Sequence, residues 1–216
     1  MPAIDKKWDN HSVGKVNYII GNPPFYGSRN QTKEQKEDMK LIFNGVKSAG
    51  VLDYVAAWYL LASKYILNTD IKVGFVSTNS ITQGEQTGIL WNELLNKYGV
   101  IINFAHSTFN WTNEAKGNAA VHCVIIGFSN LDIQKKYLFD YLNINGEPAI
   151  KQVKNINPYL VEGSSTLILS RTKPICNTQP MMKGNAAIDD GNFVLSPEEK
   201  QEFITKYPEC KHLVRK

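Results

Sequence analysis

The chain has 216 residues, 43% of them hydrophobic and 20% charged, which excludes a disordered chain and allows one sizeable core. Lys and Arg outnumber Asp and Glu by 24 to 20, a balance that is compatible with DNA as a partner without requiring it. No apolar run approaches the ~18 residues of a membrane span, and the three cysteines lack the spacing of a zinc site, so we expect a reduced, cytoplasmic protein without membrane anchor or metal.

The first part of the chain alternates apolar segments with amphipathic ones. Val16–Ile20 is rich in β-branched residues and stops at Gly21, which predicts a buried strand that ends in a rigid loop. Strands that alternate with helices favour a parallel α/β sheet covered on both faces. The last two strands have no helix between them and predict an antiparallel hairpin at one edge. The spacing of apolar residues predicts helices over 32–46, 51–67 and 85–97, and further strands over 72–78, 100–105 and 119–128.

The pattern changes after about residue 130. Residues 136–153 predict a hairpin turned at Asn145 and Gly146, and a stretch punctuated by Pro, Gly and Asn follows it. Ser196 stands in the N-cap position of a late helix, with Pro at the first helical position and Glu199 three residues on. We therefore expect two parts, residues 1–135 and a small β-rich module over residues 136–216.

The sharpest signal is the tetrapeptide Asn22-Pro23-Pro24-Phe25, which directly follows the first predicted strand. Ligands of open α/β sheets bind at the carboxyl ends of strands. The side-chain oxygen of Asn22 and the carbonyl of Pro23 can accept hydrogen bonds from an amine on a flat ring, held in place by the two prolines. Phe25 offers a stacking face. Two acceptors on an exocyclic amine stabilise the charge that grows as its nitrogen attacks a sulfonium methyl group, so the motif predicts methylation of a planar amine.

The tetrapeptide alone leaves alternatives open. A rigid connecting loop would have the same residues, and adenine in DNA, a ribosomal base and a protein glutamine all present a planar amine. A base in duplex DNA must be flipped out, and a second aromatic side chain would help to hold it. Phe109 and Trp111 are the candidates for that second face, although ordinary core aromatics are equally expected there. His106 and His122 stay outside the catalytic set, because adenine methylation needs no general base.

With these residues in hand, the chain resembles the MmeI-like Type IIG adenine-specific DNA methyltransferases of restriction-modification systems. The resemblance implies part of a class I (Rossmann-like) S-adenosylmethionine-dependent methyltransferase sheet, followed by the start of a target-recognition domain, with double-stranded DNA as the partner. It implies the catalytic role for Asn22 to Phe25 and a contact of Asn22 with the cofactor. The residues that carry the resemblance are Tyr18–Phe25, Leu52–Trp58, Gly74–Glu85, Phe104–Ala115, Ala120–Phe128 and a block from Met182 to Ser196.

The sequence departs from that family pattern at its start. Only some fifteen residues precede the first predicted strand, and no strand with a Gly-rich turn of the Phe-x-Gly-x-Gly kind lies upstream. We therefore expect this chain to be a fragment that lacks the main S-adenosylmethionine motif and is inactive in isolation, so that a role as an inactive DNA-binding piece stays open. The first strand would then have one unpaired edge, which favours cover by another chain or self-association.

Other polar residues near the predicted strand ends have two readings. Asp53 and Tyr54 could line the pocket, although an acid at a helix start more often stabilises the helix dipole. Thr78, Asn79 and Ser80 could contact the substrate strand, or form a polar turn. The residue types alone do not decide between these readings.

Overall fold

The computed structural model describes residues 16–111, 121–171, 174, 176–178 and 194–214. The chain divides into two compact units, residues 1–170 and residues 171–216, which are described separately. Within the described ranges, no helix is long and apolar enough to cross a membrane.

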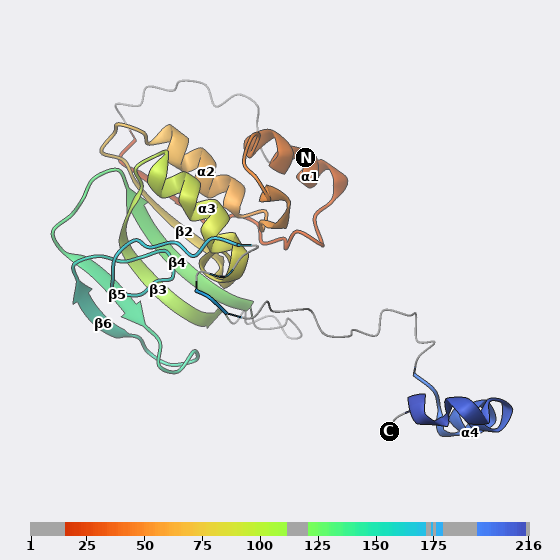
Figure 1. Ribbon diagram of the computed structural model, residues 1–216. Helices are drawn as coiled ribbons and strands as arrows, with labels where there is room; N and C mark the ends of the chain where they lie inside the picture. Colours follow the sequence, from red (N-terminus) through yellow and green to blue (C-terminus); the bar gives the residue numbers. More distant parts are fainter. Residues whose placement is uncertain (1–15, 112–120, 172–173, 175, 179–193, 215–216) are drawn as a thin grey trace. The chain divides into compact units, whose positions relative to one another are not determined.

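The first unit has the order of strands and helices that the sequence predicts (Figure 1). Its long second helix is shorter than expected, because residues 49–51 form a separate 3-10 turn and regular helix begins only at Ala56. The third strand is longer than expected and runs on to Trp111. The elements are β1 (Tyr18–Gly21), α1 (Lys33–Ile42), η2 (Ala49–Val51), α2 (Ala56–Tyr65), β2 (Lys72–Thr78), η3 (Asn79–Thr82), α3 (Gly84–Asn96), β3 (Ile101–Trp111), β4 (Val121–Ser129), β5 (Lys136–Asp140) and β6 (Ala149–Val153).

The strands form one six-stranded sheet in the order β1-β2-β4-β3-β5-β6. Strand β1 is parallel to β2, and β3 is parallel to β5, while β4 is antiparallel to both of its neighbours, β2 and β3. Strands β1, β2, β3 and β5 therefore all point the same way, and their carboxyl ends lie along the same end of the sheet. The expectation that the β3–β4 hairpin would lie at an edge is wrong, because the following hairpin, β5–β6, pairs with the outer side of β3.

Helices α2 and α3 pack beside each other on one face of the sheet (Figure 1). The ring of Tyr59 on α2 lies 6.1 Å from that of Trp91 on α3, and 5.3 and 5.4 Å from Phe75 and Phe128 of the sheet. The expectation of crossover helices on both faces is therefore wrong. Both crossovers move along the sheet in the same direction, so right-handed connections place both helices on the same side.

The second face of the sheet carries large apolar side chains with little cover from the described residues. Tyr18 and Ile20 on β1 are 64% and 83% exposed, and Phe104 on β3 is 36% exposed. The ring of Phe104 lies over Gly127 of β4, where a Cβ atom would come within 2.0 Å of it. Gly127 thus provides the space in which this ring lies flat on the sheet.

After β6 the chain returns to the helical face through residues 154–170, here called the return segment. Ile156 and Leu160 are buried in the core, and the amide of Ile168 donates to the hydroxyl of Tyr159 at 2.8 Å. The end of the segment lies on α3 at Gly88, where a Cβ atom would stand 2.9 Å from the carbonyl oxygen of Ile168. The return segment is therefore packed onto the first unit along much of its length.

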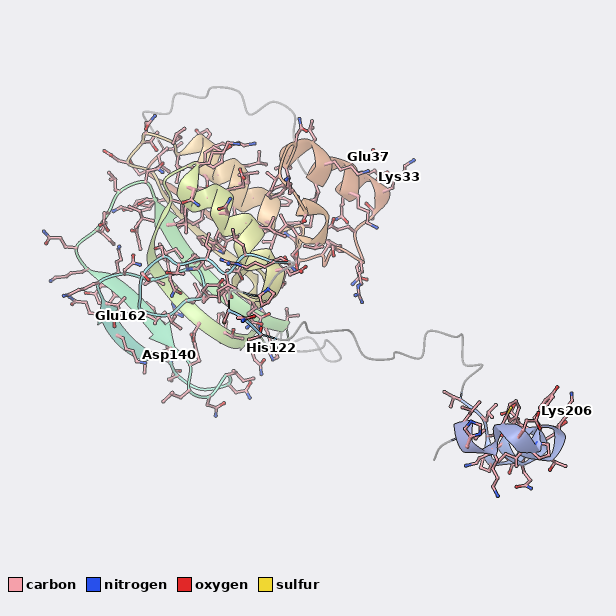
Figure 2. The ribbon with its side chains drawn as sticks, viewed as in Figure 1. Lys33, Glu37, His122, Asp140, Glu162 and Lys206 are labelled. Atoms are coloured by element: carbon pink, nitrogen blue, oxygen red, sulfur yellow. The ribbon has the colours of Figure 1, made fainter. Side chains whose placement is uncertain are left out.

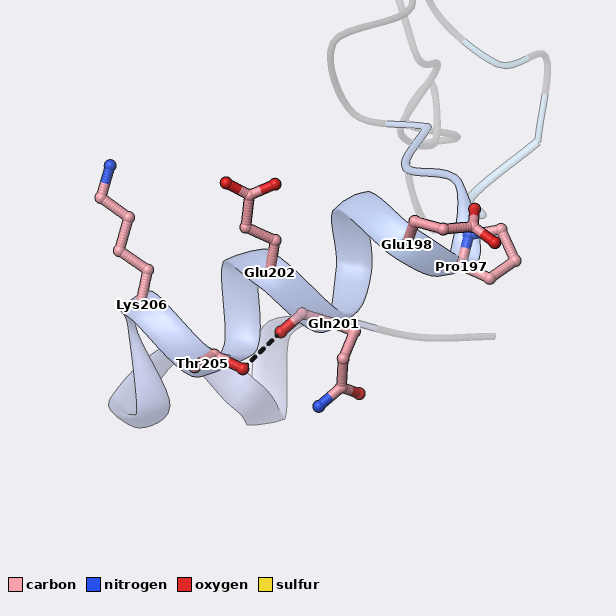
Figure 3. Close-up of a pocket in the computed structure, with 6 residues that line it drawn as sticks. All are labelled: Pro197, Glu198, Gln201, Glu202, Thr205 and Lys206. Carbon is pink, nitrogen blue, oxygen red and sulfur yellow. Dashed lines mark hydrogen bonds between the residues drawn. The ribbon is translucent and has the colours of Figure 1, made fainter.

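The second unit contains α4 (Pro197–Lys206) and η4 (Pro208–Leu213). The predicted start of α4 is confirmed: the hydroxyl of Ser196 accepts from the amide of Glu199 at 3.2 Å, and the Glu199 carboxylate accepts from the amide of Ser196 at 2.8 Å. A hollow on this unit is lined only by residues of α4 (Figure 3). The exposed side of a single helix encloses no site.

Candidate active site

The Asn22-Pro23-Pro24-Phe25 loop leaves the carboxyl end of β1, as the sequence predicts. Asn22 and Pro24 are exposed, Pro23 is buried, and Phe25 is half-buried and packs against the core. The loop thus presents the Asn22 side chain outward while its other residues hold it to the body of the sheet. Proline at two successive positions fixes the backbone torsions between these anchors.

The residue after the loop, Tyr26, is held through its backbone. Its amide donates to Oδ1 of Asp53 at 3.2 Å, and its carbonyl accepts from the amide of Tyr54 at 2.9 Å and from Nε2 of Gln31 at 3.2 Å. Asp53 and Tyr54 are both buried, and the Tyr54 hydroxyl donates to Asp38 on α1. Burial and the bond to Asp38 raise the pKa of Tyr54. Neither side chain is open to a ligand, and both act within the structure that carries the loop.

The end of β2 is tied to the same acid. Thr78 donates to Oδ2 of Asp53 at 3.0 Å, and the hydroxyl of Ser80 lies 3.5 Å from Oδ2 and 2.9 Å from Thr78 Oγ1. Thr78 and Ser80 thus form the polar turn that was one of their two predicted readings. Thr78 donates its hydroxyl proton to Asp53, and Ser80 donates to Thr78 Oγ1.

An aromatic cluster stands at the carboxyl ends of β3 and β5. The rings of His106 and Phe139 are stacked 4.1 Å apart, Phe109 is stacked on Tyr141 at 5.2 Å, and Trp111 lies 6.2 Å from Phe109. Nδ1 of His106 lies 2.9 Å from the Tyr141 hydroxyl, and burial lowers the pKa of the imidazole. The two residues predicted to stack on a base, Phe109 and Trp111, are therefore brought together.

A hollow of about 280 Å³ adjoins this cluster. Its walls come from Phe109, from Tyr141 and from the turn over residues 144–148, which the amide of Asn110 joins by donating to the carbonyl of Ile144 at 2.8 Å. His122 and Asp140, labelled in Figure 2, lie at this end of β4 and β5. Asp140 is paired with Lys151 at 2.6 Å.

The loop and the aromatic cluster both lie at the end of the sheet where the parallel strands have their carboxyl ends. Gly21 of β1 is level with Phe75 of β2, and three residues further along β2 the register forms a row of Thr78, Cys123 and Phe109 across the sheet. Three strand spacings separate β1 from β3, roughly 14 Å at ~4.8 Å each. This end of the sheet thus has a hydrogen-bonding loop on one side and flat apolar faces toward the other.

Phe139 and Tyr141 were not predicted as part of the site, because residues 136–216 were expected to form a separate module. The available signal was the alternation of Tyr137, Phe139 and Tyr141, since a period of two places three aromatic rings on one face of a strand. Within the described residues, no group of three or more His, Cys, Asp or Glu side chains could hold a metal ion.

The strand directions and the loop at the end of β1 place the chain in the α/β fold of the methyltransferases. Residues 2–140 match the family described as MmeI, DNA-methyltransferase domain, and residues 162–216 match MmeI, target recognition domain. The first match covers more than half of the chain, and the chain belongs to the MmeI DNA-methyltransferase family. Of the sequence blocks that carry the family resemblance, residues 112–115, 120 and 182–193 lie outside the described residues.

Two longer proteins are similar to this chain. The chain is 49% identical over 193 residues to DNA methyltransferase A of Bacillus subtilis (strain 168), which covers 89% of this chain and 21% of the relative. It matches the solved structure of the Type IIL restriction-modification enzyme MmeI in complex with DNA with a TM-score of 0.83 and 52% identity, covering 91% of this chain and 26% of that one. The chain therefore spans about a fifth to a quarter of the length of these relatives.

Proposed function

We propose that the protein carrying this chain transfers a methyl group from S-adenosylmethionine to the N6 amine of an adenine flipped out of a specific DNA sequence, within a restriction-modification system. The observation that carries the proposal is the position of Asn22, exposed at the carboxyl end of β1 on a loop fixed by Pro23 and by the backbone of Tyr26. Membership of the MmeI DNA-methyltransferase family supports the same reaction.

In this proposal the chain's own residues bind and orient the base. The Asn22 side-chain oxygen and the Pro23 carbonyl accept hydrogen bonds from the amine and stabilise the charge that develops on nitrogen. Phe25 stacks on one face of the ring, and Phe109 or Trp111 serves as the second aromatic face. The rate comes from holding the nitrogen in line with the methyl group, which is a matter of geometry rather than of acid-base chemistry.

Bound S-adenosylmethionine supplies the electrophilic methyl group. The residues present fit one contact to it, from Asn22, which is exposed at the end of β1, beside the edge of that strand that has no partner among the described strands. We propose that the main cofactor contacts come from a segment outside this chain that adjoins this edge. The chain alone would then bind the cofactor weakly or not at all.

We propose that residues 1–135 supply the catalytic part and that residues 136–216 begin the target-recognition part of a Type IIG enzyme in the cytoplasm. The hairpin β5–β6, which continues the sheet, would be the joint between the two. Lys151 on β6 is paired with Asp140 at 2.6 Å, so its charge has a partner within the chain.

The exposed edge of β1 supports a further proposal, that the isolated chain self-associates. Ile20 is 83% exposed on a strand that pairs only with β2 in the described sheet, and unpaired apolar edges favour pairing with another strand. Light scattering over a range of concentrations should show a mass that rises with concentration. The variant Ile20→Lys should lower this rise, and a constant monomer mass for the unchanged chain would contradict the proposal.

The decisive test of the reaction is Asn22→Ala in the complete enzyme. We expect methylation of DNA adenine to fall at least about 100-fold, with DNA affinity changed less than about twofold, because the variant removes an acceptor used in the transition state. Asn44→Ala, at an exposed position after α1, is the matched control and should keep full activity. Normal turnover by Asn22→Ala would show that this loop is not catalytic.

Calorimetry separates this proposal from the idea of an inactive DNA-binding piece. S-adenosylmethionine should bind to the complete enzyme and not measurably to this chain alone. If the complete enzyme bound DNA but did not bind the cofactor and did not methylate the DNA, the chain would be part of an inactive DNA-binding protein. If the complete enzyme methylated RNA or a protein glutamine and not DNA, the tetrapeptide would serve an RNA or protein methyltransferase instead.

A further inference from the structure

Asp53 is a buried acid whose carboxyl group joins three separate segments. Its Oδ1 accepts from the amides of Tyr26 and Val55, at 3.2 and 3.3 Å. Its Oδ2 accepts from the hydroxyl of Thr78 at 3.0 Å and lies 3.5 Å from that of Ser80. The side chain is only 3% exposed. The two oxygens thus have separate tasks, one toward the loop and the start of α2, the other toward the end of β2.

The backbone around Asp53 is itself fixed by hydrogen bonds with two glutamine side chains. Its backbone amide donates to Oε1 of Gln86 on α3 at 2.8 Å, and the adjoining carbonyl of Leu52 accepts from Nε2 of Gln31 at 3.0 Å. Gln31 also donates to the carbonyl of Tyr26. The carboxyl group therefore has fixed backbone anchors as well as fixed donors, which leaves little freedom for another rotamer.

Tyr26 is where this network meets the catalytic loop, one residue after Phe25. Its amide and its carbonyl are both bonded to the segment around Asp53. With Gly21 at the end of β1, the loop is thus clamped at both ends, by sheet pairing before it and by Asp53 after it. Loss of the Asp53 carboxylate would remove the anchor of the Tyr26 amide and the link to β2, while the Tyr26 carbonyl would stay bonded to Tyr54 and Gln31.

An acid that only stabilises the start of α2 would not need hydrogen bonds to distant segments. An acid that caps a helix accepts from amides of the first turn, whereas the bond from the Val55 amide to Asp53 closes a local turn just before α2. The bonds to Tyr26 and Thr78 span 27 and 25 residues and join the loop to β2, whose end belongs to the row that leads to Phe109. Their effect is on distances between segments, which is what a reaction that depends on alignment requires.

We infer that Asp53 is a positioning residue for methyl transfer, which sets the location of the Asn22 to Phe25 loop relative to the end of β2. The inference rests on the proposed function. Asp53 does not touch the substrate, because its oxygens are occupied and its side chain is buried. It acts through the backbone of Tyr26.

The test compares Asp53→Ala and Asp53→Asn in the complete enzyme. Asp53→Ala should lower kcat about 100-fold, the order expected when a reacting group moves by about 1 Å, with KM for DNA and for the cofactor changed less than about twofold. Asp53→Asn should stay within about threefold of the parent, because its amide oxygen still accepts from Tyr26 while its NH2 group can donate to Thr78. This rescue by the conservative variant is not expected of an acid whose charge alone matters.

Asn103→Ala is the matched control for loss of a buried polar side chain. Asn103 lies near the start of β3, at the end of the sheet away from the catalytic loop. It is 5% exposed and donates to the hydroxyl of Ser129 at 2.6 Å. It should lower the melting temperature and leave kcat unchanged. If Asp53→Ala and Asn103→Ala lost kcat in proportion to lost stability, or if Asp53→Ala kept full kcat, the inference would be overturned.

A second variant covers the case in which Asp53→Ala does not fold. Thr78→Val keeps the shape of the side chain and removes its bond to Oδ2, and it should lower kcat about three- to tenfold without changing KM. Unchanged kcat in this variant would overturn the inference. Failure of the proposed function would look different, since Asn22→Ala would then retain activity, whereas failure of the present inference leaves Asn22→Ala inactive.

Discussion

The imidazole of His106 lies parallel to the ring of Phe139, with 1° between the planes and 4.1 Å between the centroids. The two residues are register partners on the parallel strands β3 and β5. Their contact joins β3, which carries Phe109, to β5, which Tyr141 directly follows. The aromatic cluster is thus built across a strand pair rather than along one strand.

Stability should fall in mild acid because of His106. Burial lowers the pKa of the folded imidazole below its ordinary value of 6.5, so the unfolded chain binds the proton first as the pH falls. The stabilising contribution is complete above pH 6.5 and is lost as the pH falls from there through the folded pKa. Urea titrations at several pH values should show a smaller pH dependence for His106→Gln than for the parent, and His122→Gln, at an exposed position on β4, controls for removal of a histidine.

Phe109→Ala should weaken the hold on the flipped base. Stacking of a base on an aromatic side chain is worth about 1–3 kcal/mol, so single-turnover methylation by the complete enzyme should slow roughly 5- to 150-fold. Fluorescence of 2-aminopurine at the target position should report a changed environment for the base. Tyr137→Ala, a half-exposed ring on β5 outside the cluster, should behave as the parent, and an equal loss in both variants would exclude a specific role for Phe109.

Thr32→Ala should destabilise the first unit by about 1 kcal/mol. Thr32 caps α1: its hydroxyl accepts from the amide of Gln35 at 3.2 Å, and the Gln35 side chain accepts from its amide at 2.9 Å. Thr32→Ser keeps the acceptor and should lie within a few tenths of a kcal/mol of the parent. Chemical denaturation measures both, and equal stability of the Ala and Ser variants would contradict the capping role.

Gly88→Ala sets two effects against each other. Alanine favours the helix by about 1 kcal/mol, but its Cβ atom would stand 2.9 Å from the Ile168 carbonyl and 3.3 Å from Leu169. Because the backbone of the return segment must move, we expect little change in melting temperature and faster hydrogen exchange and proteolysis over residues 165–170. Gly50→Ala, where a Cβ meets nothing within 4 Å, is the control, and unchanged exchange at Gly88→Ala would show that the segment is not held there.

The sequence was informative wherever a local rule decides the structure. The strand before Asn22 was predicted within two residues of its observed start and the cap at Ser196 at its observed place, since strand periodicity and capping depend on neighbouring residues. The expectation that this strand is buried was wrong, because Tyr18 and Ile20 are exposed on the described sheet. The position of the β3–β4 hairpin inside the sheet was not predicted, because it depends on β5 pairing with β3 from outside the segment considered. The face chosen by α2 and α3 likewise depends on strand order, which residue spacing does not encode.

The candidate site shows the same division. The tetrapeptide that ends at Phe25 was identified from residue types alone, because asparagine, two prolines and an aromatic residue rarely follow a strand in this order for any other reason. The part played by Asp53 was left undecided, because its partners Tyr26 and Thr78 lie 27 and 25 residues away. Only the folded chain brings them within hydrogen-bonding distance.

The anchoring of the return segment on α3 has a practical consequence for exchanging recognition modules between related enzymes. A chimera joined after Ser170 keeps Ile156, Leu160 and Leu167 with the core they were selected to fill. A junction placed between residues 154 and 166 would instead set foreign side chains against Gly88 of α3. Splice points should therefore follow the last residue that touches the catalytic body, rather than the last strand of its sheet.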